Sequence, residues 1–272
     1  MSLARATRSE LTKQFSTSMW WILAIVLGVY VGLTATGLAF TLGAVENGAL
    51  PGGQTGLPVG DGAAPVLYSL ASAVGYVFPL LIGTLLVTGE FRHKTLTPTF
   101  LATPRRGLVL WAKLLAGAVM GALYGAVAIV VAVGPSAAVL AGFGMPTGLD
   151  TSETWAMLGR IMVSFVLWVL VGIGVGLVVR NQVAAVVIVL AFTQFVEPLL
   201  RFAGAFVEQL TVVARYLPGA AGDALVGVSI FTITASPGGD GLAWWGGGLV
   251  LLGYALALLL IGHIVSWRRD VS

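Results

Sequence analysis

The sequence has no cysteine and very few charged residues. Of its 272 residues, 9% are Asp, Glu, Lys or Arg and 58% are hydrophobic, and the mean hydropathy is +0.98. An ordinary soluble domain carries about 25% charged residues. The lack of cysteine excludes disulfides and thiolate metal sites, and two histidines alone do not make a metal site. The composition therefore indicates an integral membrane protein without a metal centre.

The small basic excess, a net charge of +3, does not indicate nucleic-acid binding. Basic residues commonly flank membrane spans, and that placement accounts for the sign of the charge here. We therefore expect the lipid bilayer, and no nucleic acid, among the partners of the chain.

Long apolar runs predict an all-α integral membrane protein with six spans. About 20 apolar residues cross the hydrocarbon core of a bilayer. The runs of this length are residues 19–43, 65–87, 108–133, 157–179, 183–202 and 242–266. The first is longer than the apolar core of a cleaved signal peptide, which covers about 7–15 residues. Residues 1–272 are thus expected to form a single transmembrane domain.

Residues 1–18 carry the pattern of an amphipathic helix that lies in the headgroup layer. Leu3, Thr7, Leu11 and Phe15 recur at every fourth position and share one helix face, and the basic residues point away from it. A frayed polar tail is the alternative interpretation.

The distribution of basic residues predicts the orientation of the chain. With the N-terminus inside, eleven of the fourteen Lys and Arg residues fall on the inner side, and only Arg160, Arg201 and Arg215 fall outside. Cytoplasmic loops carry the excess of Lys and Arg in membrane proteins. Both termini are therefore expected to be cytosolic.

Two residues inside the predicted spans are candidates for a translocation path. Pro79 predicts a kink in the second span, which neighbouring helices can accommodate. Glu197 is an acid inside the fifth span, where a charge costs about 2.5 kcal/mol or more. It lies about 21–25 Å along a helix from Arg180, so it either lines the path or reaches the outer interface. Both interpretations remain open at this stage.

The segment 203–241 is too apolar for a free loop and too interrupted for a span. Residues 203–216 and 220–231 each predict a short helix, separated by Leu217-Pro218-Gly219. We expect an extracytoplasmic helical hairpin before the last span. A re-entrant pair lining a cavity is the alternative, since irregular backbone is tolerated in membranes where it lines a cavity.

The sequence carries no nucleotide-binding or catalytic motif of its own. A phosphate-binding loop ending at Lys94-Thr95 needs glycine at positions 88 and 93, which are Thr88 and His93. Ser229 and His263 resemble a serine protease dyad, but the predicted topology separates them by about 30 Å in depth. We therefore expect no enzyme and no cofactor in this chain.

A polar segment, residues 88–107, separates the second and third spans and holds four of the fourteen basic residues. Thr97-Pro98 offers an N-cap and a first-turn proline, and Pro104 ends the turn. The segment predicts a short cytosolic helix across the membrane face. The alternative is a charged reverse turn that anchors two spans.

The order of residues in this segment follows a recognisable pattern. Glu90-Phe91-Arg92 is followed by Thr95-Leu96 and then by Leu101-Ala-Thr-Pro104-Arg-Arg106. This resembles the loop between spans two and three of ABC transporter permeases of the type-2 exporter class, whose pattern is Glu-aromatic-Arg, Thr-Leu and Leu-x-x-Pro-x-Arg. The predicted topology of the whole chain is also similar. Two positions depart from the pattern: Lys94 stands where members commonly carry glycine, and Pro98 interrupts a helix that is often continuous.

The resemblance implies that residues 89–107 form a coupling helix seated in a cleft of a separate ATPase subunit. The implied coupling residues are Glu90, Phe91, Arg92, Lys94, Thr95, Leu96, Phe100, Pro104, Arg105 and Arg106. It also implies a permease homodimer with two ATPase chains, in which the ATPases bind ATP and Mg²⁺, and a location in the plasma membrane of a bacterium.

Two other classes of function remain as alternatives. An ion-gradient-driven secondary transporter would need polar residues near mid-membrane and inverted repeats, and only Glu197 fits the first requirement. A non-transporting immunity or assembly component is the second alternative. For a transporter, spans nearly free of charge indicate a hydrophobic or amphipathic cargo such as a drug, lipid or peptide.

Overall fold

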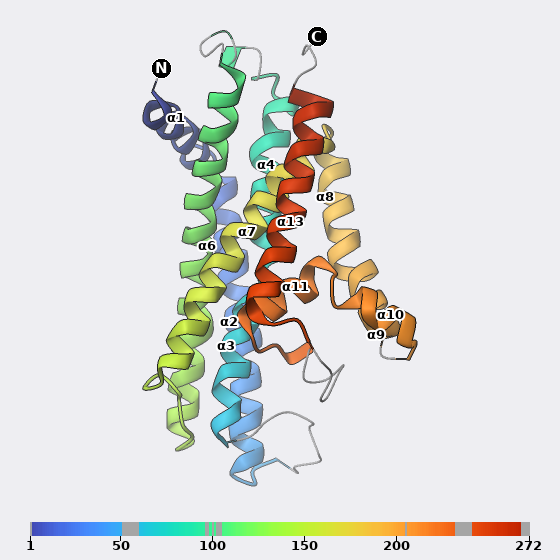
Figure 1. Cartoon of the computed structure of the whole chain (residues 1–272). Helices are drawn as coiled ribbons and strands as arrows, with labels where there is room; N and C mark the ends of the chain where they lie inside the picture. The colour runs from blue at the N-terminus through green and yellow to red at the C-terminus, as the bar shows by residue number, and fades with distance from the viewer. Residues whose placement is uncertain are drawn as a thin grey trace.

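The computed structural model describes residues 2–50, 60–95, 98–99, 101, 105–204, 206–231 and 241–267, and within these ranges its regular elements are all helices (Figure 1). The elements are α1 (Leu3–Phe15), α2 (Met19–Glu46), η1 (Gly60–Gly62), α3 (Ala63–Ala73), α4 (Val77–Arg92), α6 (Arg106–Gly142), α7 (Ser152–Val178), α8 (Gln182–Ala191), η2 (Phe192–Val196), α9 (Glu197–Gly204), α10 (Glu208–Ala214), α11 (Pro218–Val226), α13 (Trp244–Gly262) and η3 (His263–Trp267).

Six of the described helical segments are long and apolar enough to span a membrane, as the sequence predicts. They are Met19–Glu46, Ala63–Arg92, Arg106–Gly142, Ser152–Val178, Gln182–Gly204 and Trp244–Val265. The third is nine residues longer at its C-terminal end than predicted, because α6 continues through Pro135. Neighbouring helices can tolerate a proline inside a transmembrane helix, so Pro135 does not end α6.

The segment formed by α3 and α4 is the centre of the bundle. In its most apolar stretch, 89% of the residues are buried within the protein, against 22% for α2, for α8–α9 and for α13. Figure 1 shows α1, the end of α4, the start of α6 and the end of α13 at one end of the bundle, here called the α1 end. The end of α2 and the start of α3 lie at the opposite end.

The central helices α4 and α7 approach closely through two glycines. A Cβ atom on Gly83 would collide with the carbonyl oxygen of Val169, and a Cβ atom on Gly172 would collide with that of Leu80. Small residues allow this backbone contact, which drives helix association in membranes. The glycines therefore fix the position of α4 against α7.

Replacing Gly172 by alanine should destabilise the protein by about 1–3 kcal/mol, because an added methyl group in a packed contact forces the helices apart. Gly159→Ala on the same helix is the matched control, since no atom lies within 4 Å of the added Cβ. Thermal unfolding in detergent measures both variants. Equal midpoints for the two variants would contradict the assigned contact.

The second span is interrupted at residues 74–76, between α3 and α4. The sequence predicts a kink at Pro79, and the break lies three to five residues before it. A proline ring clashes with the carbonyl of the residue four positions earlier, here Gly75. The helix therefore breaks around Gly75 and not at Pro79, because the proline ring clashes with the residue four positions earlier. Pro79 is buried in the first turn of α4.

The segment between the fifth and sixth spans contains α10 and α11, each shorter than predicted. The helix predicted over 203–216 is divided between the end of α9 and α10, and the one predicted over 220–231 corresponds to α11. Helix α11 is buried and contacts α7, α13 and α3. It therefore lies inside the helix bundle. The extracytoplasmic location of this segment stays a prediction.

Candidate coupling site and cavity

The connection after α4 begins with a helix-ending turn centred on Lys94. The backbone N–H of Thr95 donates to the carbonyl oxygen of Glu90 at 3.1 Å, and that of Lys94 donates to Phe91 at 3.4 Å. This pair of bonds defines the Schellman motif, whose central residue is left-handed and is usually glycine. Lys94 has φ of +53° and is the only non-glycine residue with positive φ in the described part. The position thus favours the glycine that the type-2 permease pattern carries here.

Lys94→Gly should raise the free energy of unfolding by about 1 kcal/mol, because glycine adopts the left-handed conformation without the cost that a Cβ atom brings. Lys94→Met removes the charge and keeps the Cβ, so it should change stability little. Thermal unfolding of both variants separates the two effects. A gain for the methionine variant equal to that for glycine would assign the effect to charge instead.

Four charged side chains form a closed ring at the α1 end of the bundle. We call them the charge ring: Glu10 and Lys13 of α1, Glu90 of α4 and Lys113 of α6. Lys13 Nζ lies 2.6 Å from Glu10 Oε1 and 3.0 Å from Glu90 Oε1. Lys113 Nζ lies 2.6 Å from Glu10 Oε2 and 2.7 Å from Glu90 Oε2. Each carboxylate therefore bridges both ammonium groups.

Three members of the charge ring are buried, the side chain of Lys13 is 38% exposed, and the ring is electrically balanced. Lys113 is fully buried, Glu10 is 3% exposed and Glu90 is 7% exposed. A buried charge is tolerated when it is paired and hydrogen-bonded, and two acids here neutralise two bases. Lys13 Nζ also donates to Thr99 Oγ1 at 3.4 Å, in the connection between α4 and α6. The ring thus joins three helices to that connection.

The ring shifts the pKa values of its two α1 members in opposite directions. Burial alone would raise the pKa of Glu10, but the ion pairs with Lys113 and Lys13 outweigh it and lower this pKa. Burial alone would lower the pKa of Lys13, but Glu90 and Glu10 outweigh it and raise this pKa. Both shifts favour the charged forms, and so they stabilise the docking of α1.

These shifts predict that α1 stays docked across neutral pH and loosens in acid. The contribution of Glu10 is complete above its unfolded pKa, about 4.3, and is lost as pH falls through the lower folded value. That of Lys13 is complete below about 10.4 and is lost as pH rises through the higher folded value. Spin labels at R8C and R105C should report a constant distance from about pH 5 to 9 and a broad distribution below about pH 4.

The chain has no native cysteine, so the two labels carry no background. An E10Q variant is the control, because its distance distribution should already be broad at pH 7. A wild-type distance that stays unchanged throughout the acid titration, until the spans themselves unfold, would contradict the role of the ring in docking α1.

Four other predicted coupling residues belong to the described ends of α4 and α6. Phe91 is half-buried against the main apolar core, and the exposed Arg92 donates from Nη1 to Gln182 Oε1 at 3.4 Å. Arg105 is exposed at the start of α6, and Arg106 is half-buried. The remaining coupling residues, Leu96, Phe100 and Pro104, lie outside the described residues, as do residues 97, 102 and 103 of the predicted helix over 89–107.

The sequence predicted Glu90 as a coupling residue and did not indicate the other members of the ring. Its carboxylate pairs inside the chain with Lys13 and Lys113, so α4 links the ring to the connection. One sequence signal for the ring was present: Lys113 lies within the predicted third span. A lysine inside a span requires an acidic partner.

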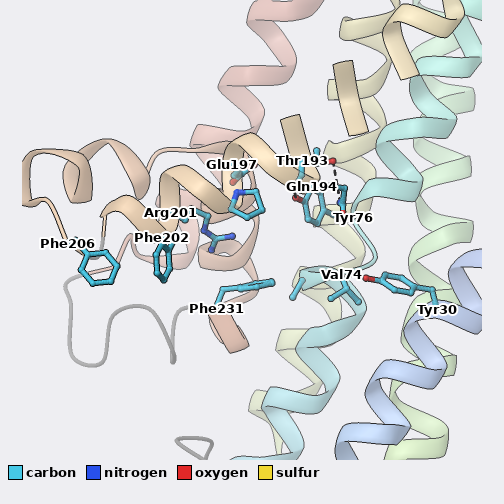
Figure 2. Close-up of a pocket in the computed structure, with 12 residues that line it drawn as sticks. Tyr30, Val74, Tyr76, Thr193, Gln194, Glu197, Arg201, Phe202, Phe206 and Phe231 are labelled. Atoms are coloured by element: carbon cyan, nitrogen blue, oxygen red, sulfur yellow. Dashed lines mark hydrogen bonds between the residues drawn. The ribbon is translucent and has the colours of Figure 1, made fainter. Parts of the chain in front are cut away.

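A cavity of about 650 Å³ lies between α2, the break at residues 74–76 and α9 (Figure 2). Aromatic and apolar side chains make most of its wall. Its lining residues are Tyr30, Ala73, Val74, Tyr76, Thr193, Gln194, Glu197, Pro198, Arg201, Phe202, Phe206 and Phe231. Figure 2 shows Arg201, Phe202 and Phe231 on one side of the cavity, and Val74 and Tyr30 on the other.

The structure brings one of the two candidate path residues to the cavity. Glu197 lines it, although only 1% of Glu197 is exposed. Pro79 is not among the lining residues; the break that precedes it supplies Val74 and Tyr76 instead. The hydroxyl of Tyr76 donates to the carbonyl oxygen of Thr193 at 3.2 Å. This bond connects the break to η2.

Two ionisable residues of the region, Arg201 and Asp223, were not singled out from the sequence. Arg201 Nη2 lies 2.5 Å from Asp223 Oδ2. The two residues come from α9 and the buried α11, so the ion pair joins these two helices. The two residues are 22 positions apart in an apolar segment, and no sequence pattern indicates that they contact each other.

Neither models of known protein families nor curated proteins match this chain. Two features of the chain itself bear on its function. These are the charge ring with the adjoining connection, and the cavity beside the break in the second span.

Proposed function

We propose that this chain is the membrane-spanning permease subunit of an ATP-driven ABC exporter of the type-2 class. A separate ATPase subunit binds the connection between α4 and α6 and supplies the energy. Two permeases and two ATPases make the complete transporter. It resides in the plasma membrane of a bacterium, with the α1 end of the bundle and both termini in the cytosol.

The observation that carries this proposal is the charge ring. An energy-receiving loop must pass force to the spans, and a flexible loop would dissipate it. The ring fastens the two helices that flank the connection to each other and to α1. A force on the connection therefore moves three helix ends together.

Helix α4 links the connection to the cavity. Glu90, at one end, belongs to the ring, and Tyr76, at the other, lines the cavity. The 14 positions between them span about 21 Å of helix. ATP-driven closure of the ATPases would push the ring end of α4, and the break at residues 74–76 would let its other end reshape the cavity. Rigid elements with localised hinges transmit motion in this way.

The helix-ending turn gives independent support. Lys94 occupies the left-handed position of the Schellman motif, which favours glycine. The resemblance to type-2 permeases implies glycine at the same place. Lys94 departs from the family pattern in residue type, but its backbone adopts the left-handed conformation that a glycine at this position favours.

The test is reconstitution with the candidate ATPase. A tagged form of this chain is co-expressed with the ATPase of the neighbouring reading frame, and the two are purified together. In proteoliposomes, the complex should hydrolyse ATP and transport cargo, whereas either chain alone should not transport. Failure of every phosphate-binding-loop ATPase of the source organism to co-purify would overturn the proposal.

A second candidate function is transport driven by an ion gradient. The buried Glu197 beside a cavity within the fifth span favours it, because carboxylates inside membranes mark ion pathways. Transport by the purified chain alone, in liposomes with a proton or sodium gradient and no ATP, would establish this function instead.

A further inference from the structure

The walls of the cavity are suited to an organic cation. Five aromatic rings line it: Tyr30, Tyr76, Phe202, Phe206 and Phe231. A cation within about 6 Å of a ring centroid is attracted by the negative face of the ring. The guanidinium of Arg201 already lies 5.3 Å from the ring of Phe231. The cavity thus contains one cation–π contact and further rings that could make others.

The charges at the cavity do not balance. Arg201 and Asp223 neutralise each other in their ion pair. Glu197 has no ion-pair partner in the part of the chain that the structure describes, and its Oε2 atom has no hydrogen-bond partner there. When Glu197 is ionised, the three ionisable residues therefore sum to one negative charge.

The carboxylate of Glu197 is held in place by the start of α11. Its Oε1 atom accepts a hydrogen bond from the backbone N–H of Ala220 at 3.0 Å. The N-terminal end of a helix carries partial positive charge and favours a carboxylate there. This contact fixes one oxygen of Glu197, and the second oxygen remains without a donor. A buried anionic oxygen without a partner is costly, so a bound cation would offset that cost.

We propose that the cavity binds lipophilic organic cations, and that such cations are the cargo class of the transporter. The assignment as cargo rests on the proposed function, whereas binding does not depend on it. The volume of about 650 Å³ falls in the range of ligand pockets, about 300–1,000 Å³. A neutral lipid tail would fill the cavity and leave the charge of Glu197 unbalanced. A lipophilic anion would be repelled by it.

The experiment compares two probes of the same shape and opposite charge, tetraphenylphosphonium and tetraphenylborate. The purified full chain is placed in phosphatidylcholine nanodiscs, and equilibrium binding is measured against empty nanodiscs. Tetraphenylphosphonium should bind saturably, at least about tenfold more tightly than tetraphenylborate, because the charge of Glu197 attracts one probe and repels the other. Equal binding of both probes, or no saturable binding of tetraphenylphosphonium, would overturn the proposal.

Two matched pairs of variants locate the site. E197Q keeps the shape of the side chain and should weaken tetraphenylphosphonium binding about tenfold, whereas E153Q, at an exposed acid of α7, should not. F202L removes an exposed lining ring and should weaken binding about 2–5-fold, whereas F195L, at an exposed ring outside the cavity, should not. Loss of binding in both members of either pair would place the site elsewhere.

These experiments distinguish a failure of the cation-binding proposal from a failure of the proposed transport function. The nanodisc measurement needs no ATPase and no nucleotide. Selective binding without ATP-driven transport would leave the cation site intact and contradict the proposed function. ATP-driven transport of neutral amphiphiles, with no cation binding, would support the proposed function and overturn the cargo class.

Discussion

Replacing Lys113 by methionine should lower the free energy of unfolding by about 3–5 kcal/mol, the usual cost of removing one partner from a buried ion pair. Lys113 is fully buried and lies 2.6 Å from Glu10 and 2.7 Å from Glu90. Without it, two buried carboxylates share the single ammonium of Lys13. The ring then carries an uncompensated negative charge between three helices.

A combined variant tests whether this loss comes from charge. K113M/E10Q retains one acid and one base, Glu90 and Lys13, so it should recover part of the stability lost in K113M. R8M, at an exposed position on the same helix as Glu10, is the control for removing a basic residue and should change stability by less than about 0.5 kcal/mol. Denaturant unfolding in mixed micelles measures all three. Similar unfolding curves for K113M and R8M would contradict the energetic role of the ring.

Neutralising Glu90 or Arg92, at the end of α4 that leads into the connection, should uncouple ATP hydrolysis from transport. In the complex with its ATPase, R92A should reduce cargo transport about tenfold, since loss of an interface charge pair costs at least about 1.4 kcal/mol. E90Q should reduce it at least as much, because it leaves the two lysines of the ring with one acid. ATP hydrolysis should continue in both variants, because the chain carries no part of the nucleotide site.

The measurement is the number of cargo molecules transported per ATP hydrolysed in proteoliposomes. R8A is the matched control, because Arg8 is an exposed arginine at the same end of the bundle but outside the connection. Its transport ratio should equal that of the wild type. Wild-type ratios in R92A and E90Q would refute the assignment of the connection as the coupling site.

The spans could be predicted from the sequence because a bilayer imposes a local rule. Each span needs a continuous apolar run of fixed length, and all six predicted runs correspond to described helices. The ends were less predictable, as α6 shows by continuing past Pro135 to Gly142. That extension depends on packing between helices, which a local pattern does not encode.

The charge ring and the cavity depend on contacts between distant positions. Glu10 and Lys113 are 103 residues apart and meet only when α1 folds back against α6. The sequence shows that Glu197 is an acid inside a predicted span. It does not show that Glu197 lies against the start of α11. The aromatic lining comes from segments that are separate in the sequence, and single tyrosines and phenylalanines in apolar runs do not indicate a shared wall. The charge ring and the cavity could therefore be identified only from the three-dimensional arrangement of the helices.

The most direct test of the central claim is the accessibility of the R105C thiol to a membrane-impermeant maleimide, with and without the ATPase. Arg105 is exposed beside the connection, and the chain has no other thiol. The account predicts labelling in inside-out vesicles and strong protection when the ATPase is bound. Labelling from the extracytoplasmic face, or labelling from the inside that a co-purifying ATPase does not reduce, would contradict it.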